Sequence, residues 1–308
     1  VVKREFPGEK WPDMQAVALN QRRPQFADVR VRRAVDLCFD FEWTQRTLFF
    51  GSYERAQSNF QKSDYEAQGQ PSPQELALLE PFRAELPAEV FGEPRLQPVS
   101  DGSGRDRKLL GEAAKLLAEA GWKRSGDLVV NGKGERLAVE ILAEDDGLVR
   151  LFTPWMEKMR MIGIDATIRQ VDQAQYEQRQ NSYDFDFILL HWMVGATPTE
   201  DSLEILYHSN SAERPGMRNY PGTKSPAVDA LIAAAGRAGN REELVTALRA
   251  LDRVLRARLD WIPTYYLANH RVAYWDMFGF VDPKPDYGFP VEILWWFDHE
   301  KAVKIGKA

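Results

Sequence analysis

The most informative hydrophobic pattern lies between residues 183 and 219. An apolar run, Phe187–Trp192, follows two acidic residues and contains neither Gly nor Pro. A run of this length, enriched in aromatic residues, predicts a strand that is buried on both faces of a sheet. The run continues into a loop punctuated by Gly195 and Pro198, and the pattern after that loop predicts a short helix over residues 202–207.

Helical periodicity is clearest in two earlier segments. Residues 106–120 carry one apolar stripe and end before Gly121, and residues 148–162 are amphipathic and end before Gly163. Residues 128–130 and 137–142 flank an Asn-Gly pair, so we expect them to form a hairpin. Residues 52–73 are expected to form a loop. Further predicted elements are strands at Met14–Leu19, 166–171 and 262–267, an extended segment at 271–275, and helices at 29–39, 41–50, 73–86, 173–180, 227–238 and Arg241–Arg258.

Strands and helices alternate through the middle of the chain. This rhythm predicts an α/β fold with a mixed or parallel sheet flanked by helices. Ligands of open α/β sheets bind outside the carboxyl ends of the strands. Trp192, at the end of its strand, and the loop after it are therefore a candidate pocket floor, although Trp192 can equally be a core residue.

The amino-acid composition mainly excludes classes of partner and site. The net charge is −6, so there is no basic excess for nucleic acid, and the lone Cys38 excludes an internal disulfide and a Cys-based zinc site. The four His residues lack metal-ligand spacing, and no apolar run approaches the ~20 residues of a membrane span. We predict no cofactor. Because residues 1–11 are polar and the chain starts with Val, we expect a fragment or a processed chain rather than a signal peptide.

Paired carboxylates are the remaining catalytic candidates. Asp145 and Asp146 are adjacent, as are Glu200 and Asp201, but adjacency in sequence does not show that two acids converge on one bond. There is no Gly-x-Ser-x-Gly motif, and Cys38 falls on the apolar face of a predicted helix, which disfavours nucleophilic catalysis. The pattern favours a binding pocket over a reaction.

Five groups of residues form a recognisable series along the chain: FADVRVRRAV (26–35) with Phe39-Asp40, AAKLLAEAGW (113–122), Gly163-Ile164 with residues 171–176, residues 183–192 and residues 219–232. In this order they resemble segments of the extracellular solute-binding proteins of bacterial ABC importers, family 5. Details near residues 39–43 and 71–76 are most similar to the Yej-type subgroup, which is linked to oligopeptide uptake.

The resemblance implies a lobe of the periplasmic-binding-protein type II fold. Residues 1–270 would form the C-terminal solute-binding lobe, and residues 271–308 a return segment that packs on an N-terminal lobe absent from this chain. It further implies a periplasmic protein that delivers a peptide or peptide-like solute to ABC transporter permease subunits, with no nucleic-acid partner and no span of its own. The implied cleft contains Trp192, Met193, Val194, Gly195, Thr197, Asn219, Tyr220, Asp145 and Arg150.

The loop after Trp192 departs from the resembling dipeptide binders. In those proteins this loop carries an Asp for the ligand's amine, whereas here it reads Met193, Val194 and Gly195. We therefore expect recognition by main-chain hydrogen bonds and aromatic contact. The alternatives are a carbohydrate-active enzyme that uses the paired carboxylates and an interaction module that uses the aromatic tail.

Overall fold

A computed structural model describes residues 1–192, 195 and 197–307, apart from the side chain of Trp192. At its centre is a six-stranded mixed sheet, which confirms the predicted α/β class. In spatial order the strands are β3 (Tyr53–Arg55), β9 (Trp261–Leu267), β2 (Met14–Leu19), β8 (Phe187–Trp192), β6 (Ala138–Ala143) and β7 (Asp165–Gln170).

Strand directions define two edges of this sheet. Strands β8, β6 and β7 are parallel, and β2 runs antiparallel between β8 and β9, with Met14 opposite Trp192 and Leu19 opposite Phe187. Strands β6, β7, β8 and β9 therefore all end on one side of the sheet. We call this side the carboxyl edge, and the side where β8 begins the amino edge.

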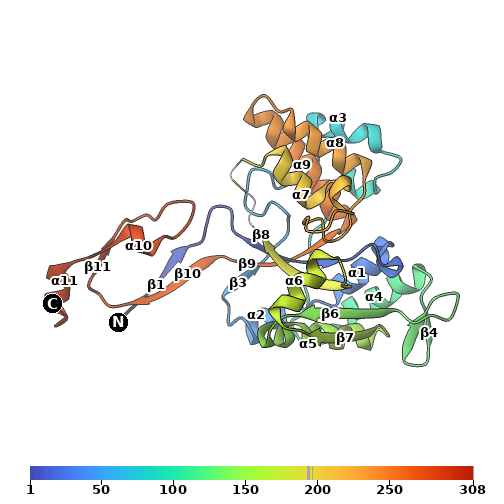
Figure 1. The fold of residues 1–308 in the computed structure, drawn as a ribbon, viewed down its shortest axis with the longest axis horizontal. Coiled ribbons are helices and arrows are strands. Elements are labelled where there is room, and N and C mark those ends of the chain that lie inside the picture. The colour runs from blue at the N-terminus through green and yellow to red at the C-terminus, as the bar shows by residue number, and fades with distance from the viewer. Residues whose placement is uncertain (193–194, 196, 308) are drawn as a thin grey trace.

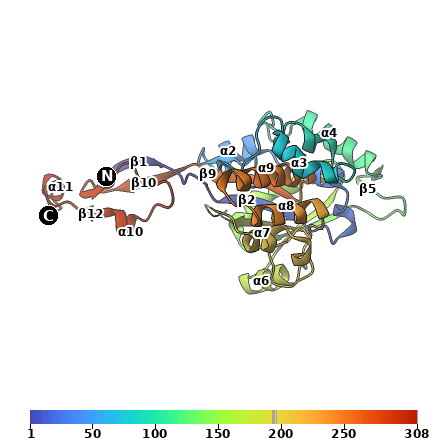
Figure 2. The ribbon, with the colours of Figure 1, turned by 90° about the horizontal axis from the view of Figure 1, so that it is seen from above.

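Helices cover both faces of the sheet (Figures 1 and 2). Two separate clusters of buried apolar side chains, one for each face, join the helices to the strands. One face carries α3 (Pro73–Leu79), α6 (Gln173–Asn181), α7 (Glu200–Tyr207), α8 (Pro226–Gly236) and α9 (Arg241–Arg258). The other carries α1 (Val29–Leu37), α2 (Phe41–Thr47), α4 (Arg107–Glu119) and α5 (Asp146–Met161).

Strand β2 shows why the sheet is buried on both sides. Ala16 and Ala18 belong to the cluster under α8 and α9, whereas Val17 and Leu19 belong to the cluster over α1 and α5. Fully burying a Val or Leu side chain contributes about 1.5–3 kcal/mol, so each face of the strand stabilises its own helix layer. The first half of β8 is buried in the same way, as the sequence predicted.

An arm extends from the lobe (Figure 1). It contains two antiparallel strand pairs and is closed by an aromatic cluster. The pairs are β1 (Val2–Pro7) with β10 (Asn269–Tyr274), and β11 (Phe278–Phe280) with β12 (Trp295–Phe297). Helix α10 (Val291–Leu294) lies between β11 and β12, and α11 (His299–Lys304) follows β12. The cluster is Phe6, Tyr274, Phe280, Phe289 and Trp295. We call residues 1–7 and 269–307 the arm, residues 8–11 and 268 the junction, and residues 12–267 the lobe.

Several sequence expectations were wrong. Strand β5 (Leu128–Val130) pairs with β4 (Lys123–Ser125) through a turn at Gly126, whose φ is +60°, whereas β6 joins the main sheet. The predicted hairpin thus survives only as one isolated bridge between Val130 and Arg136. The apolar side chains of β6 are better buried in the central sheet than in a surface hairpin.

Other elements also differ from the predictions. Residues 2–7 form a strand, because β10 pairs with them, and β3 lies inside the expected loop 52–73. Helix α3 ends at Leu79 and continues as a 3-10 turn at Glu80–Phe82, because Pro81 supplies no N–H for an α-helical bond. Cys38 follows the last turn of α1 as its C-cap and is fully buried.

Candidate ligand-binding site

The carboxyl edge gathers several acidic side chains from the ends of β6 and β7. Asp145 caps α5, and its Oδ1 accepts a hydrogen bond from the Leu148 amide at 2.8 Å. Asp172 caps α6 in the same way, at 2.9 Å from the Gln175 amide. These acids follow their strands directly because a short turn leads from each strand into a capped helix.

Glu144 shows the electrostatic consequence of this clustering. Partial burial, followed by the negative charges of Asp145 and Glu177, raises the pKa of the Glu144 carboxyl above its usual range. Arg150 lies exposed near the start of α5. This part of the edge therefore offers mainly negative charge, with one nearby cation.

Strand β8 brings the predicted loop to the same edge. The backbone of Trp192 pairs with Met14, and Gly195 and Thr197 are exposed. A Cβ added to Gly195 would meet nothing within 4 Å, so its main chain is open to a ligand. Met193 and Val194 lie outside the described residues. Beneath β8, the Tyr176 hydroxyl donates to the Leu189 carbonyl at 3.1 Å, and its burial raises the pKa of this phenol.

Asn219 and Tyr220 do not share this edge. Asn20 and Gln21 follow the end of β2, which lies at the amino edge, and the Gln21 amide donates to the Pro221 carbonyl at 2.8 Å. The Arg22 guanidinium donates to the carbonyls of Asn219 and Tyr220 at 3.0 and 2.9 Å. The two residues therefore lie at the end of β8 opposite to Trp192, contrary to the expected single cleft.

The Asn219 side chain has a structural task at that position. It is fully buried, its Nδ2 donates to the carbonyls of His208 and Thr223, and its Oδ1 accepts from the Thr223 amide. The Tyr220 ring packs edge-on against Trp261 in the core. We correct the sequence expectation accordingly: these residues hold a loop, and the Pro221-Gly222 turn that follows them was the available signal for this role.

The sequence analysis did not predict a role for the residues of the junction. The Gly8 amide donates to the Ala268 carbonyl at 2.8 Å, where the chain leaves and re-enters the lobe. Trp11 is 7% exposed and contacts Tyr65 of the lobe and Tyr287 of the arm, with ring centroids 5.7 and 5.3 Å apart. Residues 1–11 lack alternating hydrophobicity, so only the pairing with β10 reveals their role.

The reactive candidates from the sequence have other functions. Burial raises the pKa of the Cys38 thiol far above its usual range, which suppresses the thiolate. The Asp146 carboxylate accepts a hydrogen bond from Gln170 at 3.0 Å, and Glu200 and Asp201 lie in the first turn of α7, where negative charge stabilises a helix. Among the described residues, no three His, Cys, Asp or Glu side chains are grouped to hold a metal ion.

In the part of the chain that the structure describes, no helix is long and apolar enough to cross a membrane.

The fold of the chain is similar to that of an oligopeptide-binding protein, AppA from Bacillus subtilis, solved in complex with a nonapeptide. The TM-score is 0.68 at 16% identity, over 96% of this chain and 52% of that one. At this level of identity the likeness shows the fold alone.

Two curated relatives are similar in sequence. The uncharacterized protein YejA of Escherichia coli (strain K12) is 38% identical over 100% of this chain and 51% of its own length. The probable peptide-binding protein YejA of Agrobacterium fabrum is 38% identical over 92% of this chain and 46% of its own. The chain thus spans about half the length of the relatives it matches.

A family profile matches most of the lobe. The profile of bacterial extracellular solute-binding proteins, family 5 Middle, matches residues 7–214, which include β2, β6, β7 and β8 of the carboxyl edge. The description of this family is that of solute-binding proteins. Because the match covers more than half of the chain and agrees with the sheet order and the relatives, the chain belongs to family 5 of the bacterial extracellular solute-binding proteins.

Proposed function

We propose that the carboxyl edge is one wall of a ligand cleft and that the chain is one lobe of a periplasmic peptide-binding protein. One observation supports this most strongly: both junction segments leave the lobe at that edge, one before β2 and one after β9. The half of the protein that the relatives possess in addition would then be carried by the arm and would face the carboxyl edge. A solute would be enclosed between the two halves.

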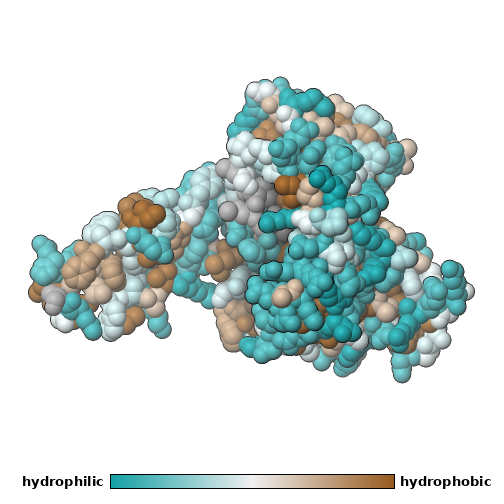
Figure 3. Space-filling model, viewed as in Figure 1, coloured by the Kyte–Doolittle hydropathy of each residue, from teal (hydrophilic) through white to brown (hydrophobic). Residues whose placement is uncertain are grey.

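The surface of the arm supports this arrangement. Figure 3 shows apolar side chains gathered on the arm, away from the lobe. Exposed apolar surface on this scale marks an interaction site. We propose that the arm, with β1 added to the predicted segment 271–308, packs on that other half, whereas the lobe corresponds to most of residues 1–270. The exposed apolar side chains of the arm include Trp275, Tyr287, Ile293, Trp296, Phe297 and Val303.

Main-chain recognition of a peptide fits the composition of the edge. Met193, Val194 and Gly195 carry no polar side chain, so hydrogen bonds from these three residues can come only from their backbone. Thr197 adds a hydroxyl, Trp192 an aromatic surface, and Asp145 and Arg150 one charge of each sign. A zwitterionic peptide matches such a set, and a relative is named a probable peptide-binding protein.

The proposed protein performs no chemistry. Its lobes would close on an oligopeptide or peptide-like solute and present it to the permease subunits of an ABC importer at the membrane. The helix-capping roles of Asp145 and Asp172 count against a hydrolase at this edge, because these carboxylates are already engaged by backbone amides.

Calorimetry on the full-length protein tests the proposal. A panel of tri- to nonapeptides should give heat of binding without product, and Trp192→Ala should weaken binding by more than about 1 kcal/mol, as for a buried aromatic anchor. Trp122→Ala is the matched control, because Trp122 follows α4, close to the amino edge. Equal affinity of the Trp192→Ala variant and the unaltered protein, or release of a cleaved product, would refute the proposal.

A further inference from the structure

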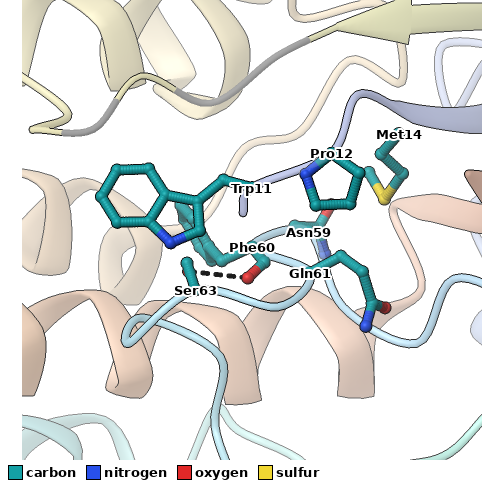
Figure 4. A pocket seen from close by; sticks show the side chains of 7 residues that line it. All are labelled: Trp11, Pro12, Met14, Asn59, Phe60, Gln61 and Ser63. Atoms are coloured by element: carbon teal, nitrogen blue, oxygen red, sulfur yellow. Dashed lines mark hydrogen bonds between the residues drawn. The ribbon is translucent and has the colours of Figure 1, made fainter. Parts of the chain in front are cut away.

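A cavity of about 10 Å³ lies where the junction meets a loop of the lobe (Figure 4). Trp11 and Met14 line it from the junction and the start of β2, and Asn59 and Phe60 line it from the loop at residues 58–63. A space of this size accommodates one water-sized molecule and nothing larger.

Three buried polar atoms at this cavity have no hydrogen-bond partner among the described residues. They are Nε1 of Trp11 and both Nδ2 and Oδ1 of Asn59. The Asn59 side chain is 1% exposed, so open solvent cannot satisfy its amide. In proteins, the great majority of buried polar groups have a hydrogen-bond partner. Three such atoms without a partner, on residues that line one small space, point to a bound molecule.

The loop that carries Asn59 is fixed. The Asp252 carboxylate of α9 accepts hydrogen bonds from the Ser58 hydroxyl at 2.8 Å and from the Asn59 amide at 3.2 Å. The Ser58 hydroxyl in turn accepts from the Phe60 amide at 2.8 Å. These bonds hold the backbone of Asn59 in place beside the cavity.

The Trp11 side of the cavity is fixed as well. Its ring lies against Tyr65 of the lobe and Tyr287 of the arm. The indole ring and the Asn59 side chain therefore line a space that their neighbours have already shaped.

We propose that this cavity is a binding site for one water molecule. The water accepts hydrogen bonds from Trp11 Nε1 and Asn59 Nδ2 and donates one to Asn59 Oδ1, which satisfies all three atoms at once. A carbonyl or carboxylate oxygen could not donate to Oδ1, and an ammonium group could not accept from the indole. Water has both properties and fits the volume.

The site would have a mechanical consequence. Trp11 lies where the chain passes from the arm into the lobe, and the water would connect it to a loop that Asp252 anchors to α9. The junction would then be fastened to the core of the lobe through one exchangeable molecule. This inference concerns the chain itself and holds whichever solute the protein binds.

A crystal structure of this chain at about 1.5 Å resolution tests the site directly. We expect one isolated density peak within hydrogen-bond distance of Trp11 Nε1 and the Asn59 amide. An empty cavity, or an Asn59 amide bonded to another protein group, would overturn the proposal. Density continuous with a bound solute would also overturn it, in favour of a solute hydroxyl.

Thermal unfolding gives an independent test with a predicted sign. Asn59→Leu removes both polar atoms with little change in volume, so loss of the water's bonds should lower the Tm by several degrees. If the cavity were dry, the same change would remove two unpaired groups and leave the Tm equal or higher. Asn210→Leu, at an exposed Asn, controls for the substitution itself and should leave the Tm unchanged.

Discussion

Gly8 is the position at which the junction is most sensitive to added volume. A Cβ at Gly8 would lie 2.6 Å from the Ala268 carbonyl oxygen and 3.0 Å from the Leu267 oxygen, whereas ordinary contacts begin near 3.4 Å. These neighbours are backbone atoms and cannot rotate away. Gly8→Ala must therefore separate the two junction segments and lengthen the 2.8 Å bond from the Gly8 amide to Ala268. Overpacking costs about 1–3 kcal/mol, and the weakened hydrogen bond adds about 1 kcal/mol.

Hydrogen exchange by mass spectrometry locates this cost. Peptides covering β1 and β10 should exchange faster in the Gly8→Ala variant, by roughly tenfold for each 1.4 kcal/mol of opening free energy, whereas α9 should be unchanged. Gly132→Ala is the matched control, because nothing lies within 4 Å of the added Cβ and the backbone is not left-handed. Exchange of β1 and β10 at the wild-type rate in Gly8→Ala would refute the close approach of the two segments.

Three further predictions address the core, the site and the arm. Burial alone would raise the pKa of Asp260, but the charges of Arg258 and Arg32 lower this pKa below its usual range. The Asp260 carboxylate therefore stabilises the fold above about pH 4, and this stabilisation is lost as the pH falls through the lowered pKa. Asp260→Asn should accordingly lower the free energy of unfolding, measured in urea, by about 3 kcal/mol at pH 7 and by much less at pH 2. Glu80→Gln, at an exposed ion pair, should leave the free energy of unfolding unchanged. Mutation of Thr197 to Val should weaken peptide binding in the full-length protein severalfold if its hydroxyl contacts the ligand; unchanged calorimetry would exclude that contact. The isolated chain should dimerise or aggregate through the arm in concentration-dependent light scattering, and a concentration-independent monomer would contradict this.

The sequence predicted several strands and helices of the lobe. Strand β8 carries a continuous apolar run, and α4 and α5 carry a stripe at helical spacing with a Gly after the last turn, so local patterns sufficed. Asp106 and Asp145, as N-caps, mark the helix starts within a residue or two of the predictions.

Other features depend on partners that lie far away in the sequence. Strand β1 exists because β10, more than 260 residues later, supplies its hydrogen bonds, and its own residues carry no strand pattern. Likewise Asn219 was assigned to the cleft by resemblance, but the bonds from Gln21 and Arg22 place its loop at the amino edge. Both outcomes follow from long-range pairing, which composition and periodicity do not encode.

The distribution of buried charge explains how the lobe can carry the carboxyl edge as a fixed surface. Asp260 joins the end of α9 to Arg32 on α1, and Asp252 fastens the loop at residue 58, all inside the lobe. Breaking such buried pairs costs several kcal/mol, whereas an exposed pair contributes about 1 kcal/mol or less. The arm is tied mainly by exposed groups, such as Arg271, whose guanidinium donates to the Gly51 carbonyl and to the Ser52 hydroxyl, each at 2.9 Å. Movement of the arm relative to the lobe should therefore be concentrated at the junction. The ends of β6, β7 and β8 would keep their mutual geometry, and the distance between them and the opposite wall of the proposed cleft would change.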